Sequence, residues 1–359
     1  MNKKLRMKAL CFILIIYTIF APLSISTHAE ECVPALSDDT VVGSRFWELF
    51  FGEEKKDNEQ ILLLPGGEVF GVKIRQKYVT VTDSYGVPAL KNGDIILSVN
   101  GEEVHSASDV KRMVQRSGGS SLTIRALHQG SELAVEIRPS FENGEYRLGL
   151  TLRDGAAGLG TVTFIDPETG LFGGLGHGIC DADSGEVISM ESGEVCGVIL
   201  GGIHKGESGK PGELCGILTD RDLGDLTVNC ECGVFGIITD LPGTAEAIPI
   251  GRREEVSEGE ATIISTLKNG KTTEYKIEIY EIDRDSDGSK SFRIRVTDET
   301  LKALTGGIVR GMSGSPIIQN GKLIGAVTHV LVADPTEGYG IFIENMLNYS
   351  SLPEQQKAA

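Results

Sequence analysis

The chain has 359 residues, of which 40% are hydrophobic and 24% are charged, and its formal net charge at neutral pH is -17. This composition excludes a fibrous or broadly disordered protein and supplies apolar residues for about two folded domains. The negative charge argues against nucleic acid as the main partner, because phosphate binding needs clustered Lys and Arg side chains, and the sequence has no such cluster.

The first 29 residues have the pattern of an export signal. Four basic residues precede an apolar run from 9 to 21, and small and polar residues follow as far as Ala29. The run is shorter than the roughly 20 apolar residues of a membrane-spanning helix, and its basic flank is typical of a signal peptide. Residues 1–29 are therefore predicted to be a signal peptide cleaved after Ala29, or an uncleaved anchor that associates the protein with a membrane.

Residues 30–60 are predicted to be a linker, and the aromatic cluster at 46–51 within it is expected to pack onto the following domain. Six of the seven cysteines lie beyond the signal segment, where disulfides are permissible in an exported protein. Their spacing predicts no particular pairing. No paired CxxC or HxxxH spacing occurs, so the sequence predicts neither a metal site nor a cofactor.

Residues 61–139 have the pattern of a compact α/β domain. Short alternating runs separated by Gly turns predict strands, and Ser106 is placed to cap a helix over 106–116. The apolar face of that helix would comprise Val110, Met113 and Val114. The stretch at 89–101 (Ala-Leu-Lys-Asn-Gly-Asp-Ile-Ile-Leu-Ser-Val-Asn-Gly) resembles the PDZ domains of bacterial exported proteases. We therefore expect a PDZ-like domain here.

The resemblance to PDZ domains implies a groove between a strand and this helix, in which an extended peptide adds as an extra strand. Residues 65–71 stand where the carboxylate-binding loop of such domains would lie. The predicted peptide-binding residues are therefore Gly66, Gly67, Phe70 and Gly71. The alternative is a domain that serves only as a structural spacer, because a fold alone does not establish binding.

Residues 140–350 contain many short β-like runs that are divided by Gly, Asp and Asn turns, with little helical periodicity. This pattern favours a trypsin-like β-barrel domain or a pair of barrels, so the chain as a whole is expected to be mainly β. Residues 351–359 are predicted to be a tail.

The sequence Gly-Met-Ser-Gly-Ser-Pro at 311–316 resembles the Gly-x-Ser-Gly-Gly-Pro turn of trypsin-like peptidases. A nucleophilic serine needs a tight turn that exposes its hydroxyl and aims backbone N–H groups at the developing oxyanion, and flanking glycines permit that geometry. The pattern predicts Ser313 as the nucleophile, with the N–H groups of Gly311 and Ser313 as the oxyanion hole. A glycine-rich turn with an incidental serine is the alternative.

A serine hydroxyl needs a neighbouring base to be nucleophilic at neutral pH. His177 ends an apolar strand and opens into a turn, where a rigid backbone can present an imidazole. His204, in a charged Gly-rich loop, and His329, after a strand, remain competitors. A third member should be a carboxylate that holds the imidazole tautomer, and composition alone does not select it.

The whole chain resembles the stage IV sporulation protein B (SpoIVB) serine peptidases of endospore-forming bacteria. Export segment, PDZ domain and peptidase domain come in that order, and the resemblance is carried by the stretches at 146–150, 153–161, 176–177, 311–316, 325–330 and 334–341. It implies Ser313 as nucleophile, His177 as base and Asp298 as acid. Because trypsin-like folds place the acid well upstream of the nucleophile, Asp334 and Asp181 stay open for that role.

The resemblance also implies a signalling endopeptidase that is exported into the space between forespore and mother cell. In that family the enzyme cleaves itself and the regulatory subunit of an intramembrane metalloprotease, and a late sigma factor is activated as a result. Two rival functions are a general quality-control PDZ protease, in which the PDZ domain would follow the peptidase domain, and a non-catalytic binding protein.

Overall fold

The computed structural model describes residues 60–85, 87–182, 184–239, 246–268 and 270–349. The predicted signal segment at 1–29, the aromatic cluster at 46–51 and the predicted tail at 351–359 lie outside these ranges. Within them strands predominate, so the predicted mainly β fold is confirmed. In the same ranges, no helix combines the length and the apolar character that crossing a membrane requires.

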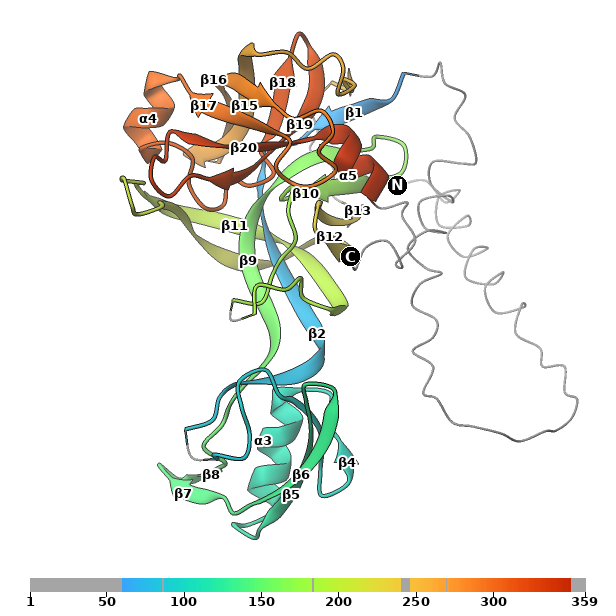
Figure 1. The fold of residues 1–359 in the computed structure, drawn as a ribbon, viewed down its shortest axis with the longest axis vertical. Coiled ribbons are helices and arrows are strands. Elements are labelled where there is room, and N and C mark those ends of the chain that lie inside the picture. Colours follow the sequence, from blue (N-terminus) through green and yellow to red (C-terminus); the bar gives the residue numbers. More distant parts are fainter. Residues whose placement is uncertain (1–59, 86, 183, 240–245, 269, 350–359) are drawn as a thin grey trace, which may run out of the picture. The chain divides into compact units, whose positions relative to one another are not determined.

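Six antiparallel strands form a first barrel, because their pairings run from β9 through β10, β13, β12, β11 and β2 back to β9 (Figure 1). The strands are β2 (Val69–Asp83), β9 (Thr151–Ile165), β10 (Leu171–Gly174), β11 (Met190–His204), β12 (Glu213–Cys230) and β13 (Gly233–Ile238). Along β2, Phe70, Val72 and Ile74 recur at every second position and are at most 4% exposed. This alternation is what a strand with one face on a core requires.

A second closed barrel follows, with its strands paired in the order β15-β16-β17-β20-β19-β18. The strands are β15 (Gly259–Lys268), β16 (Lys271–Ile282), β17 (Phe292–Val296), β18 (Pro316–Gln319), β19 (Lys322–Val330) and β20 (Glu337–Phe342). Its core includes the β-branched and aromatic residues Ile263, Ile277, Ile294, Val327 and Phe342. The helix α4 (Glu299–Thr305) follows β17, and α5 (Ile343–Tyr349) follows β20.

β2 and β9 continue side by side from the first barrel into a separate hydrophobic core, which is that of the PDZ-like unit (Figure 1). The other elements of this unit are β3 (Ile95–Val99), β4 (Glu102–Glu103), α3 (Ala107–Arg116), β5 (Leu122–His128), β6 (Ser131–Ile137), β7 (Ser140–Glu142) and β8 (Glu145–Arg147). Ser106 caps α3 by accepting from the Asp109 N–H at 3.1 Å, and the predicted apolar face of the helix is buried. The predicted helix and its cap are confirmed.

The hydrophobic cores divide the chain differently from the boundary predicted at residue 61. Residues 70–74 of β2 belong to the core of the first barrel, whereas Val79 to Ile137, together with 146–152, make up the PDZ-like core. The strand from Val69 to Asp83 is continuous, so its sequence contains no turn that marks the change of core. The short strand β1 (Leu62–Pro65) pairs with β9 and with β14 (Ile248–Pro249), and therefore also lies with the peptidase.

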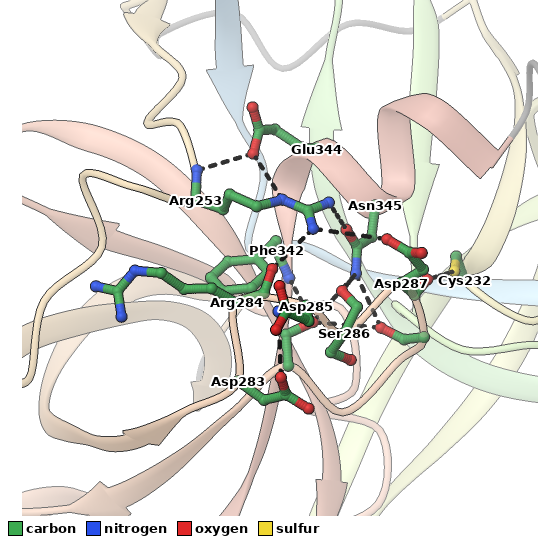
Figure 2. Close-up of polar contacts among 12 residues, drawn as sticks. Cys232, Arg253, Asp283, Arg284, Asp285, Ser286, Asp287, Phe342, Glu344 and Asn345 are labelled. Carbon is green, nitrogen blue, oxygen red and sulfur yellow. Dashed lines mark hydrogen bonds and ion pairs between the residues drawn. The ribbon is translucent and has the colours of Figure 1, made fainter.

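A polar network fixes the loop at 283–290 (Figure 2), and Ser289 of this loop lines a cavity that His177 and His329 also line. Arg253 donates from its backbone N–H to the Glu344 carboxylate at 2.8 Å and from Nη2 to Asn345 Oδ1 at 2.8 Å. Asn345, which is 4% exposed, donates to the carbonyl oxygens of residues 286 and 288 at 2.8 and 3.1 Å. Hydrogen bonds from a buried amide thus replace the regular backbone pairing that this loop lacks.

Candidate active site

Ser313 lies in a tight turn between α4 and β18. Gly311 and Gly314, on either side of it, have φ angles of 96° and 93°, a conformation that favours glycine. Gly314 is also closely packed, because a Cβ atom there would lie 2.0 Å from the carbonyl oxygen of Thr161 and 2.4 Å from the backbone nitrogen of Leu175. Both glycines are therefore required by the turn.

Two threonines of β9 fix this turn. Thr161 donates from its backbone N–H to the Ser313 carbonyl oxygen at 2.9 Å and from its hydroxyl to the Gly311 carbonyl oxygen at 2.8 Å. Thr163 donates from its hydroxyl to the Gly314 carbonyl oxygen at 2.8 Å. Both threonines are completely buried, where hydrogen bonds are electrostatically stronger than in water. Thr161 ends the stretch at 153–161 that carried part of the family resemblance, whereas no motif pointed to Thr163.

The backbone N–H groups of the turn divide into two kinds. Those of residues 312 and 314 donate to carbonyl oxygens at 3.1 and 2.7 Å. Among the described residues, the N–H groups of Gly311 and Ser313 have no acceptor. Two unengaged backbone donors beside a nucleophile are what an oxyanion hole requires. The geometry therefore leaves the predicted pair available for a developing oxyanion.

The half-buried Ser313 hydroxyl donates to the carbonyl oxygen of Thr328 at 2.8 Å. Across the described ranges, no hydrogen bond joins it to His177. A rotation of the serine side chain away from this carbonyl would be needed before the base could take its proton. Loose contacts of this kind are common in peptidases without substrate, because the catalytic hydrogen bonds tighten only in the substrate complex.

His177 follows β10 through two residues with left-handed backbone, Leu175 at φ 65° and Gly176 at φ 67°. Its Nδ1 lies 2.9 Å from the carbonyl oxygen of Gly178, which can only accept, so Nδ1 carries the proton. Nε2 is then the basic nitrogen, as general-base catalysis requires. Burial lowers the pKa of His177 from its ordinary value of 6.5, and the Gly178 carbonyl opposes this shift.

The His177 segment and the nucleophile turn both contact Thr328 in β19. A Cβ atom at Gly176 would lie 2.9 Å from the Thr328 Cγ2, and the Thr328 carbonyl accepts the Ser313 hydroxyl. The ring of the next residue, His329, lies 5.0 Å from the ring of His177 between centroids. The structure thus brings the two predicted catalytic residues to the same strand.

His329 lies next to His177. From the sequence it was only one of the competitors for the role of base. Burial, together with His177 and Lys290, lowers the pKa of His329 to about 4, so the ring is neutral at physiological pH. Its Nδ1 is buried and has no hydrogen-bond partner among the described residues. A neutral ring beside His177 keeps water away without adding a charge that would suppress the base.

The family resemblance implied Asp298 as the acid beside His177, but in the structure Asp298 caps a helix. It is the N-cap of α4, and its Oδ1 accepts from the Leu301 N–H at 3.0 Å. Its Oδ2 accepts from the Lys276 N–H at 3.3 Å. Burial opposes ionisation of the carboxyl, but these backbone donors and the Lys276 charge lower its pKa overall. In the described part of the chain, no hydrogen bond or ion pair joins Asp298 to His177.

Three other candidates for the acid and the base, Asp181, Asp334 and His204, are engaged elsewhere. Asp181 forms an ion pair with Arg153 at 2.6 Å, and Asp334 accepts from the backbone N–H and the hydroxyl of Thr336. His204 lies at the end of β11, where its Nδ1 is 2.9 Å from a Glu213 carboxylate oxygen. The tautomer-fixing contact of His177 is therefore the backbone carbonyl of Gly178.

A cavity of about 550 Å³ opens beside His177 and His329. Its wall includes the small residues at 156–158 of β9, together with Ile179 and Val187 from the following loop. The polar side chains of Glu231 and Ser289 also line it. A mostly apolar cavity with few polar groups next to a base is the usual form of a substrate pocket.

The predicted peptide-binding residues do not lie in the PDZ-like unit, and that prediction is wrong. Phe70 is 1% exposed in the core of the first barrel. Cβ atoms at Gly66 and Gly71 would lie 2.3 Å from Val162 O and 2.4 Å from a Leu218 side-chain carbon. A Cβ at Gly67 would lie 2.6 Å from a side-chain carbon of residue 264 in the second barrel. The error follows from the continuous strand β2, which shifts the start of the PDZ-like core.

The segment that does run along α3 is at 146–154. Gln115 of α3 donates to the Tyr146 carbonyl oxygen at 2.7 Å, and the Ala107 N–H donates to Asp154 at 2.8 Å. Between these two contacts, the N–H groups of residues 148–150 have no acceptor among the described residues. Free N–H groups beside a helix can receive an added peptide. The stretch at 146–150 carried part of the family resemblance, and this resemblance was the only sign in the sequence that the segment beside α3 has a role.

The model of the SpoIVB peptidase S55 family matches residues 144–347. The chain belongs to this family. It is accordingly a serine peptidase, and the model of the PDZ domain matches residues 89–127 within the PDZ-like unit. No curated protein matches the chain.

Three solved structures resemble parts of this S55 peptidase. The active form of the Rv3671c protease of M. tuberculosis is 15% identical over 70% of this chain and 87% of that chain, with a TM-score of 0.29. The inactive form is 14% identical over 56% of this chain and 85% of that chain, with a TM-score of 0.30. The PDZ domain of the SdrC-like protein Lmo2051 of Listeria monocytogenes is 20% identical over 23% of this chain and 87% of that chain, with a TM-score of 0.19.

Asp298→Asn is expected to be phosphonylated at Ser313 by a fluorophosphonate at a rate within about twofold of wild type, because Asn caps a helix as well as Asp does. Asp298→Ala should lose the cap and lower the free energy of unfolding in urea by about 1 kcal/mol. A folded Asp298→Asn that reacts more slowly by about 10⁴ would instead identify Asp298 as the acid of a triad.

The pKa of His177 predicts the acid limb of the pH profile. Only the neutral imidazole can accept the serine proton, and burial holds its pKa below 6.5, so activity should persist below that pH and fall as the pH drops through the lowered pKa. The rate at which an uncharged fluorophosphonate phosphonylates Ser313, measured between pH 4 and 8, tests this expectation. A midpoint at or above 6.5 would contradict the burial of the base.

Proposed function

We propose that this S55 peptidase is an exported serine endopeptidase that acts as a signal in sporulation, cleaving itself and the regulatory subunit of a membrane-embedded protease. Release of that protease would activate a late sigma factor. The observation that carries the catalytic part is the turn at 311–314, in which the backbone N–H groups of Gly311 and Ser313 have no acceptor among the described residues. The signalling part is supported by the membership of the chain in the SpoIVB family.

The proposed location is the space between the forespore and mother cell membranes, with the protein attached or delivered through its N-terminal segment. The basic residues and the apolar run from 9 to 21 support export. Such a location would confine the peptidase to a few substrates, since only proteins exposed to that space would meet Ser313.

The PDZ-like unit is proposed to select those substrates by binding an extended peptide along α3. The unengaged N–H groups at 148–150 supply the donors that such a peptide needs, and the partly buried side chains of Leu148, Leu150 and Leu152 line the same segment. Binding there would hold a protein substrate close to the peptidase and raise the effective concentration of its cleavage site.

Ser313→Ala should abolish self-cleavage and fluorophosphonate labelling while leaving the fold intact, because loss of a nucleophile costs on the order of 10⁴ to 10⁶ in rate. His177→Ala should have a similar effect, and the double variant should be scarcely slower than either single one. Labelling and the appearance of shortened chains on gels would be measured. Self-cleavage by Ser313→Ala within tenfold of wild type would favour a non-catalytic role for this turn.

Arg147→Glu should slow the processing of a protein substrate about tenfold, because it places a negative charge beside the unengaged N–H groups that would receive the peptide. Its labelling by a fluorophosphonate should equal that of wild type, since Arg147 lies outside the catalytic cavity. Arg138→Glu, with the same change of charge at an exposed position after β6, is the matched control. Equal processing by the two variants would leave the PDZ-like unit as a spacer.

A further inference from the structure

A cluster of three metal-ligand side chains lies on the β11–β12 hairpin. His204, Glu213 and Cys215 offer one nitrogen, one carboxylate oxygen and one sulfur, all within 4.8 Å of one another. The pairing of the two strands produces the cluster, because His204 lies opposite Glu213, and Gly202 lies opposite Cys215. Neighbours across an antiparallel pair and residues two apart along a strand share one face.

This face of the hairpin is open, whereas the other face is buried. Leu214, between two members of the cluster, is 6% exposed and belongs to the core of the second barrel. The side chains of His204 and Glu213 are 73% and 51% exposed. A Cβ atom at Gly202 would meet nothing within 4 Å, so no side chain fills the space opposite Cys215. Room therefore exists for an ion and for a further ligand from solvent.

We propose that His204, Glu213 and Cys215 bind a zinc ion. Nitrogen, oxygen and thiolate sulfur together are the donors that zinc accepts, whereas calcium and magnesium require oxygen. Ligand atoms around a tetrahedral zinc ion lie about 3.3–3.8 Å apart. The cluster spans 2.9 Å between His204 and Glu213 and at most 4.8 Å overall, so small side-chain rotations reach that geometry.

A zinc ion at this site would affect the structure close to Ser313. The Leu214 N–H donates to the Arg310 carbonyl oxygen at 2.9 Å, and Glu213 forms a parallel bridge with Arg310. A Cβ atom at Gly311 would lie 3.1 Å from the Leu214 side chain. An ion that joins β11 to β12 at residues 204, 213 and 215 would therefore stiffen the strand on which the oxyanion-side glycine rests.

The test is a titration of the purified full chain with cobalt(II) and then zinc(II), under reducing conditions and in a Ser313→Ala background that prevents self-cleavage. The protein with all three ligands should bind one equivalent of cobalt(II) and show a sulfur-to-cobalt charge-transfer band. Zinc(II) should displace the cobalt and remove the band. Cys215→Ser should lose the band and bind zinc at least about tenfold more weakly, and His204→Asn should also bind zinc more weakly. Cys180→Ser, which removes another exposed thiol, is the control and should keep the band.

Thermal unfolding supplies a second measurement that does not depend on the absorption band. Zinc should raise the Tm of the Ser313→Ala protein and of its Cys180→Ser variant, because an ion that binds only the folded state stabilises it. The same zinc concentration should not raise the Tm of Cys215→Ser. Absence of the charge-transfer band from the wild-type ligands, or its survival in Cys215→Ser, would overturn the proposal.

Discussion

The active site depends on the way in which buried Thr161 joins the two barrels. Its N–H donates to the Ser313 carbonyl, its hydroxyl donates to the Gly311 carbonyl, and its own carbonyl accepts from the Leu175 N–H. Leu175 stands two residues before His177. One residue of β9 is therefore hydrogen-bonded both to the turn of the nucleophile and to the segment of the base. A shift of either segment would leave buried polar groups of Thr161 without their partners.

This arrangement explains why the nucleophile turn can keep two N–H groups free. Thr161 and Thr163 donate to its carbonyl oxygens, and its N–H groups at residues 312 and 314 are also engaged, so the turn is held without the N–H groups of Gly311 and Ser313. Donors held in place before the reaction stabilise a developing oxyanion without reorganisation, which is the larger part of their catalytic value. The arrangement requires glycine at position 314, because the close contact with β9 and with the segment after β10 leaves no space there for a side chain.

The base is held by an uncharged contact. A carbonyl at Gly178 fixes the tautomer of His177 as a carboxylate would, but it adds no negative charge to stabilise the imidazolium that forms in the transition state. Burial lowers the pKa of His177, although the Gly178 carbonyl opposes this shift, and the neutral His329 ring adds no charge beside it. Such a site favours a base that is unprotonated at moderately acid pH over one with a strongly stabilised charged form.

The sequence by itself determined the mainly β class, the helix capped by Ser106, and the nucleophile turn, because these follow from local alternation, capping and glycine geometry. It also led to His177 and to the family through short motifs. Only the tertiary structure decided the partners of those residues. Strand pairing and packing decide the core to which β2 belongs, the segment that runs beside α3 and the cluster of His204 with Cys215. No local pattern encodes them, since strand register and barrel closure are set by packing across the whole chain.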